Sequence, residues 1–590
     1  MRIAITGIGV VSAIGMNCAE TLQSLLDERS GIGTMHILGS CHTELPVGEV
    51  PLSDAQLKQL AGIPADEPMP RTSLLGIIAA REALQQAFGS PSSAFDFRPS
   101  TFDSIAFISG TTVGGMDLTE QHWQDYHEGK ATECIPLHEA GESTNAIARH
   151  LAFNFQLSTF NIIATPSTAC SSALNAIMLG ANLLRTGQTK AALVGGAESL
   201  SLFHLNGFNT LMILDHEPCR PFDASRNGLN LGEGAGYLLL ENEEDAIARG
   251  ATILGYIGGY ANTCDAYHQT ASSDNGEGAY LAMSKALNMA GLQPADIDYV
   301  NAHGTATPNN DLSESAALRR VFGDKMPAVS STKAFTGHTT SASGGIEAVI
   351  CALAIQHGFI PANLNWSHTA EGLIQPVIHT GHRQLSHVLC NAFGFGGNES
   401  SLIISAKGIE LSEAPMIQLP NEQINVQMVN DEMVNGFVSP AEARRMTPQT
   451  RRIVAAARRA IAESSVTPEA IVCATQWGCM AQSMQFLQDM LARNEQQLKP
   501  TPFMQSTHNT VASTIAILTA NHGYNATYSQ GKQSLTCAMA DIRSQMSLGM
   551  IRSALVLEFD EQVEAWDNVL GNIGDCTQNI ARATIYKANN

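Results

Sequence analysis

The chain has 590 residues, of which 44% are hydrophobic and 15% are charged. This length allows two to four folding units, and the composition suits a large buried core rather than a disordered chain. The formal net charge of −22 argues against nucleic acid and anionic membrane surfaces as partners, because like charges repel. An acidic partner protein would have to dock on a local basic patch.

Cysteine usage and the N-terminus favour an intracellular protein. Twelve cysteines are scattered without a CxxC pair, which is typical of reduced thiols. The segment Met1–Gly9 reaches glycine and polar residues too early for the apolar core of a signal peptide. No stretch approaches the roughly 18 to 20 consecutive apolar residues of a spanning helix. We therefore expect a soluble, cytoplasmic protein without membrane insertion.

Short apolar or β-branched runs alternate with helical patterns in the first part of the chain, which favours an α/β fold. The predicted elements, in chain order, are strand Ile3–Ile5, helix Ser73–Phe88, and strands Ser104–Ile108, Asn161–Ala164 and Ala191–Val194. Two more predicted helices, Ser171–Leu184 and Gly344–Ile355, are apolar on nearly every face, as is typical of helices buried between layers. Two central helices enclosed by sheets predict a five-layer α-β-α-β-α body.

The character of the chain changes near residue 408. The segment Gly408–Ile424 has two prolines, three glutamates and no clear period, and we interpret it as a linker. The following part resembles the beginning of the chain. The matches, in the same order, are 447–465 with 72–88, 470–479 with 104–114, 506–512 with 143–148, and 548–556 with 186–194. This order favours a duplication over the general likeness of any two α/β segments.

Cys170 lies in TPSTACSS (165–172), which follows a predicted strand and opens the first apolar helix. A thiol at a helix N-terminus faces the positive end of the helix dipole and free N–H groups, which favours the thiolate. Small neighbours allow an acyl chain and its developing oxyanion to approach the backbone. Cys170 is therefore a candidate nucleophile, although a single cysteine is more often an inert core residue.

Two further segments follow predicted strands. In NAHGTATP (301–308), His303 can enter a site while the hydroxyls of Thr305 and Thr307 line an incoming ligand. In CNAFGFGGN (390–398), the glycines permit close backbone approach and hinge motion, and Phe393 or Phe395 can act as a gate. Taken singly, a hydrogen-bonded loop histidine and a tight hairpin with core aromatics are the simpler interpretations.

Lys333 and His338 lie in STKAFTGH (331–338), directly before the second apolar helix. Glu347 inside that helix is a candidate ion-pair partner for the lysine. The alternative is a surface lysine followed by a histidine that caps the helix.

In this order and spacing, these segments resemble the active-site set of the β-ketoacyl synthases, which belong to the thiolase superfamily. The segments 6–15 (TGIGVVSAIG), 219–228 (CRPFDASRNG) and 232–236 (GEGAG) add to the resemblance, which covers residues 1–407. It implies a thiolase-like five-layer fold with duplicated halves. Residues 1–250 would form the half with the nucleophile, and residues 251–407 the half with both histidines, the lysine and the gating loop.

The resemblance implies an elongating synthase that works by a ping-pong mechanism. Cys170 takes an acyl group from an acyl carrier protein, and malonyl carrier protein then binds. His303 and His338 assist decarboxylation and stabilise the enolate, which attacks the thioester. The backbone N–H groups of Cys170 and Phe395 hold the oxyanion. Two histidines, rather than a histidine and a cysteine, distinguish elongating synthases from thiolases and chain-starting synthases.

The resemblance assigns supporting roles to the remaining residues. Lys333, paired with Glu347, has an electrostatic and structural role. Thr305 and Thr307 contact the phosphopantetheine arm that carries the substrates, and Phe395 is the gate. No redox cofactor or catalytic metal is required.

The tail, residues 425–590, resembles truncated chain-length-factor-like homologues of the same synthases. Its segment YNATYSQGKQS (524–534) corresponds to the strand that leads into Cys170. Different anchors place one of three residues at the nucleophile position: Lys532, Gln533 or Ser534. Cys537 falls about a turn into the following helix, where packing is the simpler role. The tail lacks counterparts of the HGT, KxxxGH and GFGG segments, so we expect it to be catalytically inactive.

In dimers of this family, the strand before the active cysteine pairs with its equivalent across the interface. We therefore predict that Tyr524–Ser529 pairs with Asn161–Thr165, giving a pseudo-heterodimer that shapes the acyl tunnel; a homodimer is the other expected assembly. A 17-residue linker reaches at most about 56 Å, so pairing within one chain or between two chains both remain open. Such pairs are associated with type II polyketide assembly, and truncated partners resemble those of bacterial aryl polyene and flexirubin-like pathways.

Other functions fit the sequence less well. A nicotinamide site at Gly7–Gly9 would need a third glycine where Ser12 stands, and no acidic ribose partner follows at the right distance. A metal site would have to use three histidines whose spacing fits no helix face, in a segment typical of a surface loop: His379, His382 and His387.

Two alternatives concern the whole protein. One is a carrier-binding scaffold without catalysis, and the other is housekeeping fatty acid elongation. Intact Cys170, His303 and His338 favour catalysis in the first domain. Arg71 and Arg220 fall at plausible carrier-docking positions by resemblance, although a lone arginine is commonly a solvated charge or part of a structural ion pair.

Overall fold

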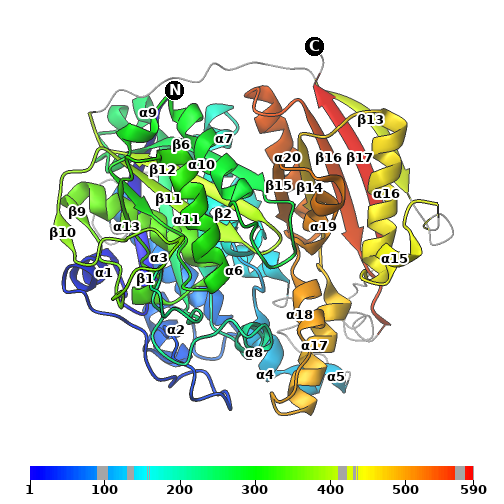
Figure 1. Cartoon of the computed structure of the whole chain (residues 1–590), viewed down its shortest axis with the longest axis horizontal. Coiled ribbons are helices and arrows are strands. Elements are labelled where there is room, and N and C mark those ends of the chain that lie inside the picture. Colours follow the sequence, from blue (N-terminus) through cyan, green and yellow to red (C-terminus); the bar gives the residue numbers. More distant parts are fainter. Residues whose placement is uncertain are drawn as a thin grey trace.

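The structure is a computed structural model of the chain. It describes residues 1–89, 104–128, 139–155, 157, 160–408, 421–428, 434, 436–564 and 579–588. Figure 1 shows two bodies side by side, the larger one formed by the first two thirds of the chain and the smaller one by the last third.

One strand order occurs three times along the chain. The first unit has β1 (Ile3–Ser12), β2 (Ile105–Gly110), β3 (Ile162–Ala164), β4 (Ala191–Glu198) and β5 (Gly234–Asn242). The second has β6 (Gly255–Cys264), β7 (Tyr299–Asn301), β8 (Ala328–Ser330), β11 (His387–Gly394) and β12 (Asn398–Ser405). The third has β13 (Asn421–Met428), β14 (Ala470–Ala474), β15 (Tyr524–Tyr528), β16 (Ser553–Asp560) and β17 (Ile580–Ala588). Numbered within its unit, each sheet has the order 3-2-4-5-1.

The strand directions also agree between the units. In each, the second strand runs parallel to the third and fourth, and the fifth runs antiparallel to the first and fourth. The duplication predicted from four sequence matches is therefore confirmed. The second unit, which forms the other half of the larger body, confirms the duplicated halves that the resemblance implies.

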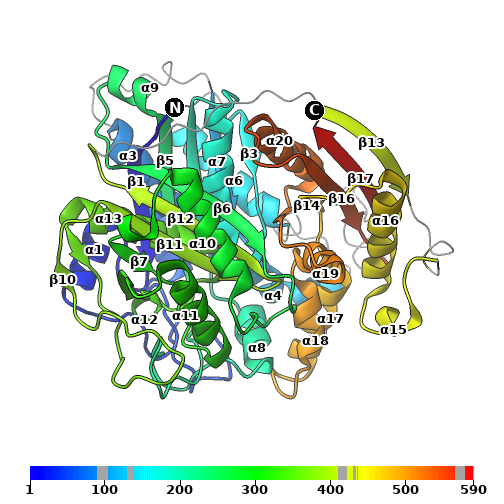
Figure 2. The same ribbon diagram turned by 45° about the horizontal axis from the view of Figure 1, so that its top comes forward.

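The larger body has the predicted five layers. The first two units share one sheet, joined where Ile3–Ile5 pairs with Gly255–Ile257. Two helices, α7 (Ser172–Arg185) and α13 (Ser343–His357), contact each other and the inner faces of both units. Outside lie α3 (Arg71–Phe88) on the first unit and α10 (Glu277–Ala290) and α11 (Pro308–Phe322) on the second (Figure 2).

The glycines near the N-terminus serve close packing. A Cβ atom on Gly7 would lie 2.1 Å from the backbone oxygen of Ala83, and one on Gly9 would lie 2.0 Å from that of Ala79. Both oxygens belong to α3, so the glycines let this helix lie directly on β1. The same two glycines were the basis of the nicotinamide alternative, and helix packing accounts for them.

The other helices connect these layers. In the larger body they are α1 (Cys18–Leu26), α2 (Asp54–Ala61), α4 (Met116–Gln121), α5 (Trp123–His127), α6 (Ala140–Asn154), α8 (Leu202–Thr210), α9 (Glu243–Ala248) and α12 (Lys333–Thr336). A short hairpin pairs β9 (Phe359–Ile360) with β10 (Gly381–His382). In the smaller body they are α15 (Pro440–Ala443), α16 (Pro448–Ser464), α17 (Met480–Ala492), α18 (Pro500–Ser506), α19 (Thr510–Thr519) and α20 (Ser534–Ser547). Within the described residues, no helix is both long and apolar enough to cross a bilayer.

The smaller body attaches through its edge strand β15. The backbone N–H of Ser167 donates to the oxygen of Thr527 at 2.8 Å, and that of Ser529 donates to the oxygen of Thr165 at 2.9 Å. The contact is one isolated antiparallel bridge between Pro166 and Tyr528, within one chain, just beyond the end of β3 at Ala164. The predicted pairing with Asn161–Thr165 is therefore present only in part, because the hydrogen bonds involve residues 165–167.

The predicted linker is too long at its C-terminal end. Residues 421–424 belong to β13, which pairs with β17 and is part of the third sheet. The third unit therefore begins at residue 421 at the latest, four residues before the predicted boundary of 425. Residues 409–420 of the predicted linker lie outside the described part of the chain.

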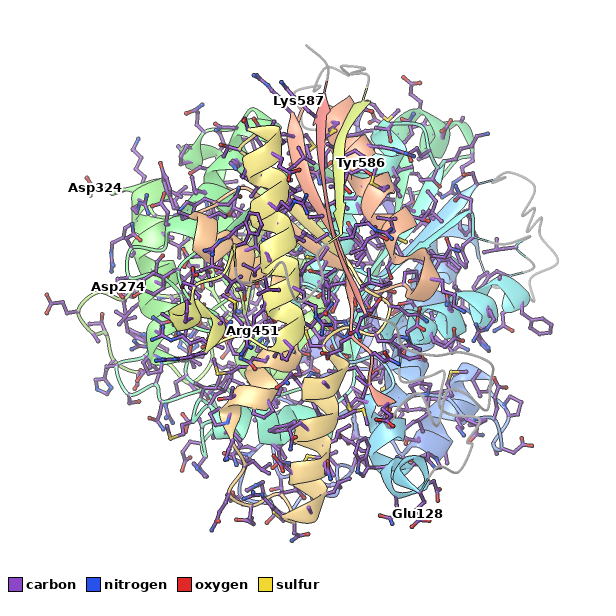
Figure 3. All side chains as sticks on the ribbon, turned by 90° about the vertical axis from the view of Figure 1, so that its right-hand side faces the viewer. Glu128, Asp274, Asp324, Arg451, Tyr586 and Lys587 are labelled. Carbon is purple, nitrogen blue, oxygen red and sulfur yellow. The ribbon has the colours of Figure 1, made fainter. Side chains whose placement is uncertain are left out.

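The equivalent helices α7 and α20 differ in burial. In α7, 13 of the 14 residues are buried between two sheets. In α20, Thr536 and Arg543 are exposed, on a face that has no second sheet to cover it. The sequence of α20 thus has polar residues where a second sheet would cover the helix, as expected for a body that contains one unit. Figure 3 shows its other side, where Arg451 lies on α16 and Tyr586 and Lys587 lie near the end of β17.

Candidate active site

Cys170 lies on a tight turn between β3 and α7. A single 3₁₀ turn spans Ala169–Ser171, and α7 begins at Ser172. Ala169 has φ 53°, in the left-handed region that costs a residue with a side chain roughly 1 kcal/mol or more. Such local strain is typical of active sites, and here it holds the thiol, which is only 5% exposed, at the N-terminus of a buried helix.

His338 approaches the thiol from the equivalent turn of the second unit. Thr340 has φ 44° and begins the 3₁₀ turn that leads into α13. The Nε2 atom of His338 lies 3.1 Å from the sulfur of Cys170, and its Nδ1 atom lies 3.0 Å from the hydroxyl of Ser343. Two residues 168 positions apart in sequence are thus within hydrogen-bonding distance.

His303 completes the group at the end of β7. Its backbone N–H and that of Gly304 donate to the carboxylate of Glu314, at 2.9 and 2.8 Å. The ring centroid of His303 lies 5.4 Å from that of His338, with the two planes at 85°. Both imidazoles and the thiol therefore lie together, as the resemblance implies.

Lys333 and Glu347 form the expected ion pair beneath the histidines. The Nζ atom lies 2.6 Å from Oε1 of Glu347, and the two side chains are 2% and 4% exposed. Burial lowers the pKa of His303 and His338 well below the ordinary value, and the charge of Lys333 lowers it further. Both rings are therefore neutral at neutral pH, each with one nitrogen that donates and one that accepts.

The resting form of Cys170 differs from the sequence expectation. Burial raises the pKa of its thiol to about 12, although Lys333 and the backbone N–H groups of Phe395 and Cys170 act in the opposite direction. The predicted thiolate is thus not the resting state, because desolvation outweighs the helix N-terminus. A neutral thiol faces a neutral imidazole, and the two converging N–H groups lie where the oxyanion was predicted.

The entrance to the thiol is a cavity of about 400 Å³. Thr305 and Thr307 line it, with their hydroxyl oxygens 2.9 Å apart, and Phe393 borders it beside the His303 ring. Phe395 is half-buried at the inner end, where it stacks on Phe208 with ring centroids 5.5 Å apart. Thr305, Thr307 and Phe395 thus line one cavity that reaches the thiol, and their roles toward a pantetheine arm and as a gate stay predictions.

A second cavity of about 50 Å³ lies on the inner side of Cys170. It is bordered by Phe203, His204 and Phe208 of the larger body. The smaller body supplies Gln476, Trp477, Ser483, Phe503 and residues 506–508. The smaller body therefore forms part of the wall of the cavity beside the nucleophile.

The third unit repeats the nucleophile turn with a different residue. Gly531 has φ 56° and begins the 3₁₀ turn Gly531–Gln533, which leads into α20. The preceding residue, Gln530, has φ −119° and ψ 42°, and its counterpart Thr168 has φ −118° and ψ 41°. This match selects Lys532 from the three candidates for the position of Cys170. Lys532 is exposed, and Cys537 is buried in α20, as expected for a packing role.

One predicted docking residue is wrong. Arg71 is 5% exposed, and its guanidinium donates to both oxygens of Glu233, at 2.7 and 2.9 Å. A carrier protein has no access to a buried ion pair. Arg220 is half-buried and paired with Asp215 at 2.8 Å, so its charge is largely neutralised.

The three histidines of the metal alternative do not assemble. His379 and His382 are exposed, whereas the ring of the buried His387 meets Ser405 at 2.8 Å. Within the described residues, the single group of three potential metal ligands is Cys41, His42 and Glu495, and it includes no residue of the active site.

Several residues of the site carry no motif in the sequence. Glu314 positions His303 from α11, and buried Glu198 accepts hydrogen bonds from Ser341 at 2.6 Å and from Thr111 at 2.8 Å. Asn509 of the smaller body donates to the backbone oxygen of Phe395 at 2.8 Å. Glu314 lies in a helix of mixed polarity, and Asn509 is some 110 residues from Phe395. Neither residue belongs to a local sequence pattern from which its role could be predicted.

Comparison with known proteins agrees with this geometry. The N-terminal domain model of the β-ketoacyl synthases matches residues 1–246, the C-terminal domain model matches residues 254–367, and a second model described as a β-ketoacyl synthase N-terminal domain matches residues 418–584. The 3-oxoacyl-[acyl-carrier-protein] synthase 2 of Vibrio cholerae is 33% identical over 415 residues, which cover 68% of this chain and 98% of the relative.

Two solved structures resemble different extents of the chain. The ishigamide ketosynthase/chain length factor is 31% identical, with a TM-score of 0.63, over 69% of this chain and 99% of the other. The PfaC ketosynthase–chain length factor covers 100% of this chain and 78% of its own, with a TM-score of 0.80; at 17% identity this likeness is one of fold. The chain therefore belongs to the β-ketoacyl synthase family, as a condensing acyltransferase whose catalytic domain is followed by a second, partial ketosynthase unit.

Proposed function

We propose that the protein condenses an acyl thioester on Cys170 with malonyl groups delivered by an acyl carrier protein, and that the smaller body limits the length of the acyl chain. The observation that carries the proposal is the meeting of one thiol and two neutral imidazoles, with the sulfur of Cys170 3.1 Å from His338. A wall contributed by the smaller body, on the inner side of the same sulfur, supports the second part.

In the first step, the sulfur of Cys170 attacks the carbonyl carbon of the acyl-pantetheine thioester. His338 accepts the thiol proton at Nε2 as the new C–S bond forms, since a neutral imidazole is the base within reach. The old C–S bond breaks, and the proton passes to the departing pantetheine sulfur. The backbone N–H of Cys170 stabilises the transient oxyanion, and the N–H of Phe395 joins it once the gating loop is in place.

In the second step, a malonyl thioester takes the place of the released carrier. Its C–C bond to the carboxylate breaks, carbon dioxide leaves, and the electron pair forms an enolate whose oxygen accepts hydrogen bonds from His303 and His338. The enolate carbon attacks the carbonyl carbon of the Cys170 thioester, the C–S bond breaks, and the departing thiolate takes up a proton from water. These steps use only side chains and backbone of the chain, so the proposal requires no metal or redox cofactor.

The pathway is proposed at the level of its class. A solved structure that is 31% identical over 69% of this chain is a ketosynthase in complex with its chain length factor from Xenorhabdus doucetiae. Together with the inner wall from the smaller body, it favours assembly of a polyketide or polyene by a pseudo-heterodimer within one chain. Housekeeping fatty acid elongation is the second candidate, since relatives named 3-oxoacyl-[acyl-carrier-protein] synthase 2 match 68% of this chain over 97% and 98% of their own length.

The test is reconstitution of the full chain with candidate acyl carrier proteins, acyl and malonyl, followed by mass analysis of protein and products. We expect an acyl adduct on Cys170, a β-ketoacyl product and carbon dioxide. The Cys170→Ala variant should give neither adduct nor condensation product. A folded wild-type chain that binds carriers but forms no adduct would instead identify a non-catalytic scaffold.

A further inference from the structure

The gating loop, defined here as Gly394–Gly397, touches the smaller body directly. The side-chain amide of Asn509 donates to the backbone oxygen of Phe395 at 2.8 Å, and Asn509 is 1% exposed. Next to it, a Cβ atom on Gly396 would lie 2.0 Å from the hydroxyl of Ser513, so the loop lies against the start of α19 without a gap. The smaller body thus contacts the gate as well as the inner cavity.

The neighbouring loop links the same partners. The backbone N–H of Gly396 donates to the oxygen of Gln269 at 2.7 Å. The side chain of Gln269 in turn donates to the hydroxyl of Thr514 on α19 at 3.4 Å. The gating loop is therefore tied to α19 by one direct hydrogen bond, by van der Waals contact and by one relayed contact.

Phe395 separates the two cavities that meet at the nucleophile. It borders both the entrance cavity and the inner cavity, and so does Phe208, on which it stacks. An acyl chain that passes from the entrance into the inner cavity must displace this ring. Condensation is served by the state seen here, because with the loop in place the N–H of Phe395 faces the Cys170 sulfur.

We propose that Asn509 is a positioning residue by which the smaller body holds the Phe395 gate closed for condensation. The inference rests on the proposed function and adds a role in timing to the role in chain length. The direct bond holds the carbonyl of Phe395, and the N–H of the same residue serves the oxyanion. Loss of the hydrogen bond from Asn509 frees the loop for chain entry and moves the N–H of Phe395 away from the oxyanion.

The size of the effect follows from the bond. A buried hydrogen bond of this kind contributes a factor of about two to ten to a local equilibrium. Replacement of the amide by a carboxylate of the same shape removes the donor and places a negative charge against a carbonyl oxygen. We expect Asn509→Asp to slow condensation by about fivefold or more, and to leave acylation of Cys170 as fast as in the wild type or faster.

The matched control is Gln505→Glu. It makes the same amide-to-carboxylate change four residues away, where Gln505 donates to the backbone oxygen of Arg445 at 3.2 Å within the smaller body. Gln505 borders neither cavity. A second variant, Gly396→Ala, acts from the gate side, since Gly396 has φ 84° and a Cβ atom there has no room against Ser513. It should resemble Asn509→Asp.

The experiment measures the two half-reactions separately on the full chain: acylation of Cys170 by acyl carrier protein under single-turnover conditions, and condensation of the isolated acyl-enzyme with malonyl carrier protein. Slower condensation with undiminished acylation, in both gate variants and not in Gln505→Glu, supports the proposal. Equal loss of both steps indicates a merely structural role and overturns it, as does an Asn509→Asp enzyme identical to the control. Wild-type protein that is never acylated overturns the proposed function, and this inference with it.

Discussion

Phe503 offers the sharpest test of the chain-length role. It is 3% exposed on α18 of the smaller body, and its ring lies 5.7 Å from Phe203 and 5.6 Å from Phe208, measured between centroids. It borders the inner cavity beside Cys170, whose volume is about 50 Å³. The Phe503→Ala variant removes most of an aromatic side chain from this wall, so the space for an acyl chain grows well beyond its present size.

The structure also sets the cost of this change. Truncation of a fully buried phenylalanine to alanine destabilises a protein by about 3–5 kcal/mol, because burial is lost and a cavity remains. Part of this cost is recovered when an acyl chain fills the space, at about 0.8 kcal/mol per buried methylene. We therefore expect longer products from Phe503→Ala and an intermediate shift from the milder Phe503→Leu.

The assay is mass analysis of products from reconstituted reactions, with thermal unfolding measured in parallel. The matched control is Phe486→Ala. Phe486 is 1% exposed and its ring lies 5.6 Å from that of Phe503, yet it does not border the cavity. Longer products from Phe503→Ala alone support the reasoning. An unchanged product distribution in a folded Phe503→Ala enzyme, or an equal change in Phe486→Ala, would refute it.

Three further predictions follow from the buried charges and the repeated turn. Since Lys333 lowers the pKa of His303 and His338, Lys333→Met should raise both pKa values and move the acidic limb of the pH–rate profile to higher pH. Leaving Glu347 unpaired should cost about 3–5 kcal/mol of stability, which the double variant with Glu347→Gln should recover. An acidic limb that does not move contradicts the assignment. Arg71→Ala should lower the melting temperature, with a cost of about 3–5 kcal/mol from the broken buried pair, and leave the KM for carrier protein unchanged; a raised KM with unchanged stability would restore its docking role. Lys532→Cys in a Cys170→Ala background should take up no acyl group, because the imidazoles that face Cys170 come from a half that the third unit does not repeat; a mass adduct on residue 532 would disprove this.

The catalytic residues could be predicted from the sequence because each lies in a short segment whose residue types are required by the local turn. Cys170 and His338 both precede buried helices on turns with a left-handed residue, Ala169 and Thr340, and small residues surround both turns. Such turns depend on neighbours along the chain. The five-layer fold was accessible for a related reason, since the all-round apolar helices α7 and α13 have no stable place except between two sheets.

The charge state of Cys170 and the role of Arg71 were harder to predict, because both depend on burial by distant parts of the chain. The helix N-terminus alone predicts a thiolate at Cys170, whereas enclosure of the sulfur raises its pKa to about 12. Arg71 looks like a free cation in sequence, and Glu233, 162 residues later, makes it a buried ion pair. Local composition carries no information about either enclosure.

The sequence by itself determined the fold class, the duplication, and the thiol, imidazoles and lysine of the site, since repeated patterns and turn-bound motifs act over a few residues. Only the tertiary structure decided that β15 pairs within the chain at residues 165–167, that Lys532 stands where the nucleophile would be, and that Asn509 and Phe503 of the smaller body reach the gate and the inner cavity. These contacts join segments more than a hundred residues apart. Their geometry depends on how two folded bodies fit together, which no local pattern encodes.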